Sequence, residues 1–341
     1  MGGLLMEELY KKINEMKLTP LTAMEIDELL DQYKDLDNDF PQLTVNNMNQ
    51  PPIDLKEKMK ELTRKVDEAS SQVEEIFQFV RKKDTIPIKE VTRDLIPIIR
   101  QASEVPHVYY LFKELQEKDE YTYRHNICVA VISAMLAKWL GFNEDQIHEI
   151  ELAGLFHDIG KTKIPYYLLH KQSRLSPREF EEMKKHTIYG YKLIQNTSYL
   201  SEEVALVALQ HHERMDGGGY PFHLKSEKIH PYAKIISVAD VFHALSSERI
   251  YHKAMPFYQV ITHLNDTLHG RFDPHTIIVF LNKMTETLVG KKVQLNNGQL
   301  GTILMNNQYR PLRSVILLES GEIIDLQKQP DLHIEKVIQV V

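Results

Sequence analysis

The segment His157-Asp158-Ile159-Gly160-Lys161 places an imidazole beside a carboxylate near the end of a predicted helix, residues 144–159. Both side chains can face one metal ion, and the carboxylate has a second oxygen with which to bind another. Lys161 lies on the same face as His157 or just beyond the helix end, where its ammonium can pair with a phosphate oxygen. A buried His-Asp hydrogen bond is the alternative explanation of the pair.

Ligand-type side chains flank this segment on both sides, and in order they are His125, His186, His211, His212 and Asp240. Imidazole and carboxylate donors suit Fe, Mn or Zn. Taken singly, each has an ordinary explanation, and a lone helical histidine is usually packed or exposed. Asp240 stands in an apolar run, where a buried carboxylate needs a cation. Together with His157 and Asp158, the set predicts a two-metal pocket that can hydrolyse a phosphate ester.

His211 and His212 are consecutive, so on a regular helix their side chains point about 100° apart. They can share a site only near a helix end, and Asp216 followed by glycines 217–219 supplies that end. Glycine adopts backbone angles that other residues avoid and lets a ligand approach closely. A plain loop after a helix is the alternative.

Composition excludes several classes of protein. The chain is 43% hydrophobic and 26% charged, which is ordinary for a globular protein. Its net charge of −7 argues against a general DNA binder, which usually has a basic face. The one cysteine, Cys128, excludes an internal disulfide, fits a reducing cytoplasm and stands in an apolar pattern typical of a buried, unreactive thiol. We expect no signal peptide and no membrane span.

The N-terminal part, residues 1–52, is predicted to hold two short helices and a linker. Residues 53–100 follow as a long helix and a connecting helix. Apolar residues of the long helix recur in alternating steps of four and three, at Leu55, Met59, Leu62, Val66, Ala69, Val73, Ile76 and Val80. This heptad seam fits either a helix packed on its own domain or a parallel coiled coil that makes a homodimer.

The remaining chain is predicted to form an all-helical domain, residues 101–289, and a small antiparallel β-barrel-like domain, residues 290–341. Ser176-Pro177-Arg178-Glu179 predicts a helix start. Alternating runs around Asn296-Asn297-Gly298 and Ser320-Gly321 predict two hairpins. In this tail, Arg310 and Arg313 could contact an anionic ligand, although solvated charges explain them as well.

In these motifs the chain resembles a known family, the HD-GYP phosphodiesterases of the HD metal-dependent phosphohydrolases. The resemblance covers about Tyr121 to Pro274. The matching pieces are Tyr123-Arg124-His125, His157 to Lys161, Leu169 to Leu175, His186 with Gly190, His211-His212-Glu213, Asp216-Gly217, Gly219-Tyr220-Pro221, Ala239-Asp240, Arg249 with Tyr251, and Phe272-Asp273-Pro274. The family implies an all-helical fold and hydrolysis of cyclic di-GMP, or a related cyclic dinucleotide, to pGpG and often GMP.

The resemblance also implies roles for individual residues. One metal would be held by His125, His157, Asp158 and Asp240, and the second by Asp158, His186, His211 and His212. Asp158 and Lys161 would be catalytic. Substrate contacts would come from Lys161, Arg249, Lys253, Gly219, Tyr220 and Pro221. Fe or Mn is favoured and Zn is acceptable, and a diguanylate cyclase is an expected partner.

This chain departs from the family at two places. Tyr121 stands where some members carry a glutamate for a third metal, so a dinuclear site is expected. His252 stands where a basic residue is usual, and Lys253 beside it could substitute. Two rival functions stay open: an HD-type phosphohydrolase of mononucleotides or guanosine tetraphosphate, and a scaffold that binds the dinucleotide without turnover.

Overall fold

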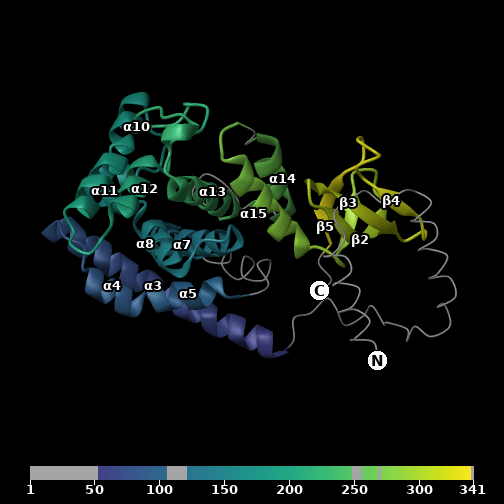
Figure 1. Ribbon diagram of the computed structural model, residues 1–341, viewed down its shortest axis with the longest axis horizontal. Coiled ribbons are helices and arrows are strands. Elements are labelled where there is room, and N and C mark those ends of the chain that lie inside the picture. The colour runs from purple at the N-terminus through teal and green to yellow at the C-terminus, as the bar shows by residue number, and fades with distance from the viewer. Residues whose placement is uncertain (1–52, 106–120, 248–254, 256, 268–269, 339–341) are drawn as a thin grey trace. The chain divides into compact units, whose positions relative to one another are not determined.

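The computed structural model describes residues 53–105, 121–247, 255, 257–267 and 270–338. Residues 49–341 belong to one compact unit. Within the described ranges, helices come first and strands follow from Lys292 onward, which confirms the mainly helical prediction (Figure 1). The predicted short helices and linker of residues 1–52 lie outside the described residues.

The helical elements are, in chain order, α3 (Ile53–Lys83), α4 (Ile88–Asp94), α5 (Ile96–Ser103), α7 (Tyr121–Trp139), α8 (Glu144–Phe156), η2 (Ile159–Lys163), α9 (Tyr166–Leu169), α10 (Pro177–Lys184), α11 (His186–Gln195), α12 (Glu202–Gln210), η3 (Ser226–Lys228), α13 (Pro231–Ser246), α14 (Phe257–Thr267) and α15 (Pro274–Glu286).

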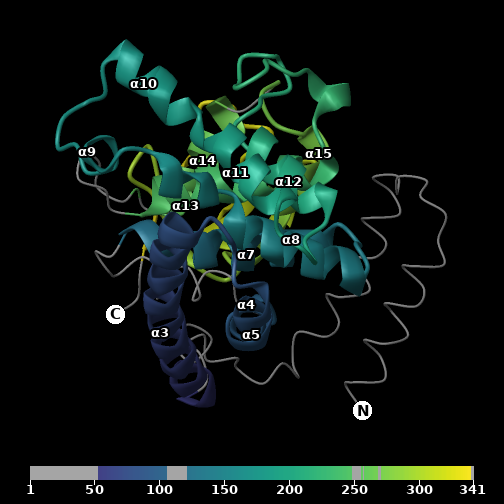
Figure 2. The same cartoon turned by 90° about the vertical axis from the view of Figure 1, so that its left-hand side faces the viewer.

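Helix α7 lies at the centre of the helical part. Its side chains from Ile127 to Ala137 are buried on every side, as expected of a helix that is apolar all round. It packs against α8, α13, α3 and α5 (Figures 1 and 2). This position places His125, near its N-terminus, in the interior of the molecule.

From Leu62 onward the heptad seam of α3 is buried within this chain, with Ile76 partly buried, and the side chains of Leu55 and Met59 lie outside what the structure describes. Leu62, Val66, Ala69, Val73 and Val80 are each 5% exposed or less, and α3 contacts α7 and α5. The alternation is thus explained by packing on the helix's own domain, the first of the two interpretations. A dimer through this part of the seam would require α3 to leave α7.

Local capping signals fix several helix ends. The hydroxyl of Ser176 accepts the Glu179 N–H, and the Glu179 carboxylate accepts the Ser176 N–H, so the predicted capping box is confirmed. The helix predicted to end at residue 159 ends earlier, at Phe156. His186, predicted in mid-helix, instead begins α11, because the helical run breaks at Lys185.

The C-terminal strands form one antiparallel sheet in the order β4-β3-β2-β1-β5. They are β1 (Lys292–Leu295), β2 (Leu300–Asn307), β3 (Arg310–Leu318), β4 (Ile323–Asp325) and β5 (Ile334–Val337). Both predicted hairpins are present, β1 with β2 and β3 with β4. The sheet is not closed, since β4 and β5 stand at opposite edges, so the barrel expectation is corrected to an open sheet of five strands.

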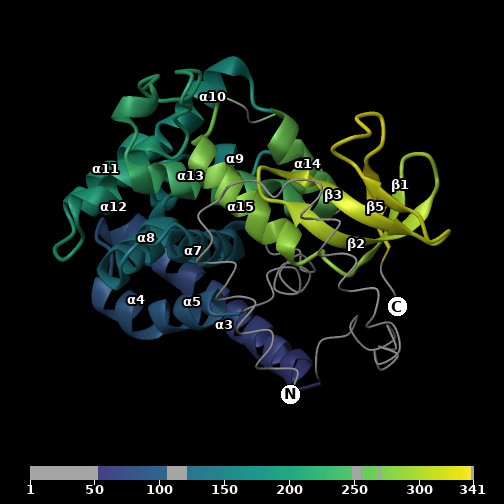
Figure 3. The same ribbon diagram turned by 45° about the vertical axis from the view of Figure 1, so that its right-hand side comes forward.

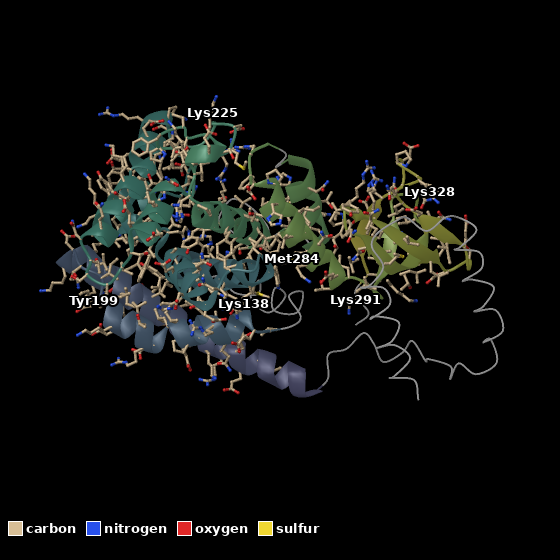
Figure 4. All side chains as sticks on the ribbon, in the orientation of Figure 1. Lys138, Tyr199, Lys225, Met284, Lys291 and Lys328 are labelled. Atoms are coloured by element: carbon tan, nitrogen blue, oxygen red, sulfur yellow. The ribbon has the colours of Figure 1, made fainter. Side chains whose placement is uncertain are left out.

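Helices α14 and α15 lie between the other helices and the sheet (Figure 3). Two amides cross from one part to the other: Asn282 donates to the Gln308 carbonyl at 2.8 Å, and Asn306 donates to the Thr285 carbonyl at 2.6 Å. Met284 of α15 is buried, whereas Tyr199 points into solvent (Figure 4). Among the described helices, none has the length and apolar character needed to cross a bilayer.

Candidate metal centre

The ligand-type residues predicted from sequence converge from five helices. His125 comes from α7, His157 caps the end of α8, His186 begins α11, His211 caps the end of α12, and Asp240 lies in α13. Asp158 and His212 directly follow His157 and His211. The Ser201 hydroxyl caps the start of α12 by accepting the Val204 N–H, and the helix ends at Gln210, directly before the paired histidines.

Donor atoms of Asp158, His186, His211 and His212 lie within 4.8 Å of one another. Within this first group, the Asp158 Oδ1 atom lies 3.3 Å from the His186 Nε2 atom and 3.7 Å from the His211 Nε2 atom. The His211 and His212 rings have centroids 4.0 Å apart at 44°. The consecutive histidines can therefore serve one site because they lie beyond the regular helix.

A second group consists of His125, His157 and Asp158, with donor atoms again within 4.8 Å. Here the other Asp158 oxygen, Oδ2, lies 3.4 Å from the His157 Nε2 atom. Asp240 lies beside this second group, since its Oδ1 atom is 3.2 Å from the Nε2 atom of His125. Because Asp158 is shared and turns one oxygen to each group, its carboxylate has the placement of a bridge between two ions.

Backbone carbonyls orient three of the imidazoles. The Nδ1 atoms of His157, His186 and His211 lie 2.7 Å from the Gly154 carbonyl, 2.7 Å from the Met183 carbonyl and 3.1 Å from the Ala208 carbonyl. A carbonyl accepts only, so each Nδ1 carries the proton and donates. The Nε2 lone pair of each ring is thereby directed at the centre, as in metal-binding histidines.

Burial sets the charge state of these rings. It lowers the pKa of His186 to about 4 and that of His211 to about 3, and it also lowers the pKa of His125 and His212. These imidazoles are neutral at pH 7, the form that binds metal. Burial alone would raise the pKa of Asp158, but Lys161 and His157 outweigh it, so the carboxyl stays ionised.

Two buried polar atoms of this cluster have no hydrogen-bond partner: His157 Nε2 and Asp158 Oδ1. Leaving such an atom unsatisfied costs roughly 1–3 kcal/mol. Both atoms point into the cluster and are metal donors by type. A divalent cation would satisfy both, so the residues present fit the metal ions that the sequence predicted.

A cavity of about 660 Å³ opens beside the cluster. Asp158, Lys161, His186, His212 and Tyr220 line it. The Lys161 ammonium lies 2.5 Å from the Asp158 Oδ2 atom, and the Tyr220 ring lies over His212 with centroids 4.6 Å apart. A substrate in this cavity would meet the centre, a cation and an aromatic wall together.

Of the Gly219-Tyr220-Pro221 turn, the Tyr220 side chain lines the cavity and its neighbours hold it there. A Cβ atom on Gly219 would lie 2.4 Å from the Arg214 nitrogen, so only glycine fits. The buried Glu213 carboxylate accepts the N–H groups of Phe222 at 2.7 Å and Leu224 at 2.9 Å. This loop is therefore fixed from inside, which sequence reasoning missed.

Two predicted substrate contacts are not described by the structure, and one histidine near the centre was not predicted. Arg249 and Lys253 lie outside the described residues, so their substrate contacts stay predictions. His243 was not predicted, yet its Nδ1 atom lies 2.9 Å from the Nδ1 atom of His125. Its place in α13, one turn after Asp240, was the signal that could have identified it.

Comparison with known proteins matches residues 109–276 to the HD domain family. A cyclic di-GMP phosphodiesterase of Pseudomonas aeruginosa is 31% identical over 252 residues, covering 74% of this chain and 61% of that protein. A cyclic di-GMP phosphodiesterase of Thermotoga maritima is 33% identical over 204 residues, covering 57% and 55%. A 3′3′-cGAMP-specific phosphodiesterase of Vibrio cholerae is 32% identical over 183 residues, covering 54% and 39%.

The chain spans less than two thirds of the length of each of these relatives. The family match and the relatives confirm the resemblance that the motifs carried. The metal-type cluster lies inside the matched range, since its outermost members are His125 and Asp240. Residues 109–276 of this chain therefore belong to the HD domain family.

Proposed function

We propose that this protein is a metal-dependent phosphodiesterase that opens cyclic di-GMP to linear pGpG. The observation that carries the proposal is the shared carboxylate: Asp158 faces one histidine group with each oxygen. Relatives whose names specify cyclic di-GMP support the substrate. Fe or Mn is the proposed metal, with Zn acceptable, because imidazole and carboxylate donors suit all three.

The reaction consumes one water molecule. Its oxygen ends on phosphorus, the bond from phosphorus to the ribose 3′ oxygen breaks, and that oxygen leaves with a proton. Divalent ions, when bound, supply Lewis acidity and lower the pKa of water. From the chain itself, Lys161 offers positive charge at the cavity wall, and Asp158 holds its ammonium in place.

Tyr220 contributes an aromatic wall to the same cavity. Burial raises the pKa of its hydroxyl far above the ordinary value, so the phenol stays neutral and can donate a hydrogen bond to the substrate. Its ring can also stack on a base, a contact worth roughly 1–3 kcal/mol. We therefore assign Tyr220 to binding and orientation.

The test is Asp158→Ala in the purified protein, with Asp145→Ala on the exposed face of α8 as the matched control. We expect Asp158→Ala to abolish cyclic di-GMP hydrolysis, followed by nucleotide chromatography, and to lower the metal content measured by elemental analysis. The control should change neither. Full hydrolysis by Asp158→Ala with metal still bound would overturn the assignment.

The same chromatography separates the rival functions. Parallel assays with 3′3′-cGAMP, guanosine tetraphosphate and mononucleotides would identify another HD-type phosphohydrolase. Binding of cyclic di-GMP without any product in the metal-loaded protein would identify a scaffold. A homodimer and a diguanylate cyclase partner stay predictions, and light scattering at micromolar concentration tests the homodimer.

A further inference from the structure

We propose that the exposed face of α3, which precedes the matched range 109–276, completes the substrate site, and that Arg81 and Lys82 bind the second phosphate of the cyclic dinucleotide. The inference rests on the proposed function and deepens it. Its basis is the composition of the cavity wall: the space lined by Asp158 and Lys161 is also lined by α3, through Glu74, Phe77, Gln78, Arg81 and Lys82.

The position of this face follows from the buried seam on the opposite side of α3. Val73, Phe77 and Val80 are at most 5% exposed, whereas Glu74, Gln78, Arg81 and Lys82 on the other side of the helix are exposed. The Phe77 ring meets the Tyr123 ring edge-on at 5.4 Å, and Lys163 of η2 forms an ion pair with Asp84. The C-terminal end of α3 thereby packs against α7 and η2.

Arg81 and Lys82 differ from Lys161, the other cation that lines the cavity, in their ion pairing. Lys161 is already paired with Asp158. Arg81 and Lys82 are exposed, and neither forms an ion pair with a carboxylate in the described part of the chain. Glu74, the acid on the same face, is engaged by the Gln78 amide at 3.1 Å. The cavity therefore offers two cations at the wall formed by α3.

The proposed substrate has a second phosphate that requires a cation. A cyclic dinucleotide carries a phosphodiester on each side of one ring, so only one of the two can lie at the metal centre. The other remains anionic, and leaving it unpaired in a partly enclosed cavity is unfavourable. Arginine and lysine are the side chains that pair with phosphate, arginine through a bidentate fork. A cavity of about 660 Å³ falls in the size range of small-ligand sites, ~300–1,000 Å³.

The test compares two substrates on the metal-loaded protein. Cyclic di-GMP has the second phosphate, whereas bis(p-nitrophenyl) phosphate has a single phosphodiester. In the double variant Arg81→Ala with Lys82→Ala, we expect KM for cyclic di-GMP to rise about tenfold or more, the loss typical of a hydrogen bond to a charged group. The ratio of kcat/KM for cyclic di-GMP to that for bis(p-nitrophenyl) phosphate should fall by the same factor.

Two further variants sharpen the result. Lys83→Ala removes one of the three positive charges of the same turn, from a residue that does not line the cavity, so it is the control for the single variants Arg81→Ala and Lys82→Ala and should leave the ratio unchanged. Arg81→Lys with Lys82→Arg keeps both charges and should retain most of the parent KM. Thermal unfolding should be the same for all variants, because these side chains are exposed.

The outcomes separate the two proposals. A parent protein that cleaves cyclic di-GMP, together with a double variant whose KM stays within about twofold, would overturn the role of α3 alone. Equal losses for Lys83→Ala and the double variant would also overturn it, because they would indicate a general field effect. A parent that hydrolyses neither compound would refute the proposed function, and this inference with it.

Discussion

Gly160 and His186 approach so closely that a Cβ atom on Gly160 would lie 1.9 Å from the His186 carbonyl oxygen. The same Cβ would lie 2.4 Å from the Gly190 nitrogen. The glycine of the His-Asp segment thus lets η2 and α11 pack backbone to backbone. This contact brings His186 to within 3.3 Å of Asp158.

Gly160→Ala should therefore push α11 away from η2 and move His186 out of reach of Asp158. Overpacking of this kind costs ~1–3 kcal/mol and sometimes more. We expect a lower urea midpoint and a lower metal content by elemental analysis. Gly190→Ala is the graded comparison, because its Cβ would meet Ala208 and Gly160 only at 3.2 and 3.3 Å. Equal effects of both changes would argue against this explanation.

Glu213→Gln tests the internal anchor of the tyrosine loop. The carboxylate accepts the N–H groups of Phe222 and Leu224, one on each oxygen, and an amide can replace only one of these acceptors. The loss should be about 1–3 kcal/mol of unfolding free energy. KM for the substrate should rise because Tyr220 loses its support. Urea unfolding and steady-state kinetics measure both.

The exposed Glu227 lies in the same region of the chain and provides the control for Glu213. Glu227→Gln changes the same charge and should alter neither quantity. If Glu213→Gln left both unfolding and KM at parent values, the loop would not depend on this anchor.

The pH dependence of stability should reveal the neutral imidazoles in protein treated with a chelator. Burial depresses the pKa of His186 to about 4 and of His211 to about 3, whereas an unfolded histidine titrates near ~6.5. Between these values the unfolded chain binds protons that the folded chain refuses, so stability is complete above pH ~6.5 and is lost as pH falls.

His157 acts in a different pH range: Asp158 outweighs burial and raises its pKa, so its contribution to stability is fully present below pH ~6.5 and is lost as pH rises through the raised value. The four rings with a lowered pKa act in the same direction, so below pH ~6.5 we expect a loss on the order of 1 kcal/mol per pH unit for each ring that stays neutral in the folded chain. His211→Asn should flatten the curve measured by urea unfolding, and His223→Asn at an exposed site should not. A flat parent curve would contradict the shifts.

The metal-donor residues could be predicted from sequence alone because histidine and aspartate are metal ligands by their chemistry, wherever the fold places them. Sequence alone did not predict how tightly the elements pack. Gly160 directly follows the predicted helix 144–159, yet its φ is not in the left-handed region that favours glycine at a helix end, and its role is a contact with α11. Likewise, His243 lies against His125, 118 positions away along the chain, and no local pattern reports such a pairing.

The fold, like the metal centre, was predictable where a local sequence pattern records it and not where distant segments pair. Seam and hairpin patterns predicted α3 and four of the five strands, because periodicity records which face is buried. The partner of that face is not recorded, so α3 fitted a dimer as well as its own domain. Strand β5 was missed, and it pairs with β1 across the 38 residues that separate Leu295 from Ile334, with the register shifted at Leu295. Closure of a sheet depends on such distant pairings.

Cys128 provides a test of the core itself. It is fully buried in α7, and burial raises the pKa of its thiol to about 11. Because the thiolate is the reactive form, the native protein should resist iodoacetamide at pH 8. In urea the thiol returns to an ordinary pKa of about 8.5 and should be alkylated readily. Mass spectrometry of the single cysteine reads out both states. Equal labelling rates with and without urea would mean that α7 is not the closed centre of the helical part, and that His125 is not held as rigidly as the metal centre requires.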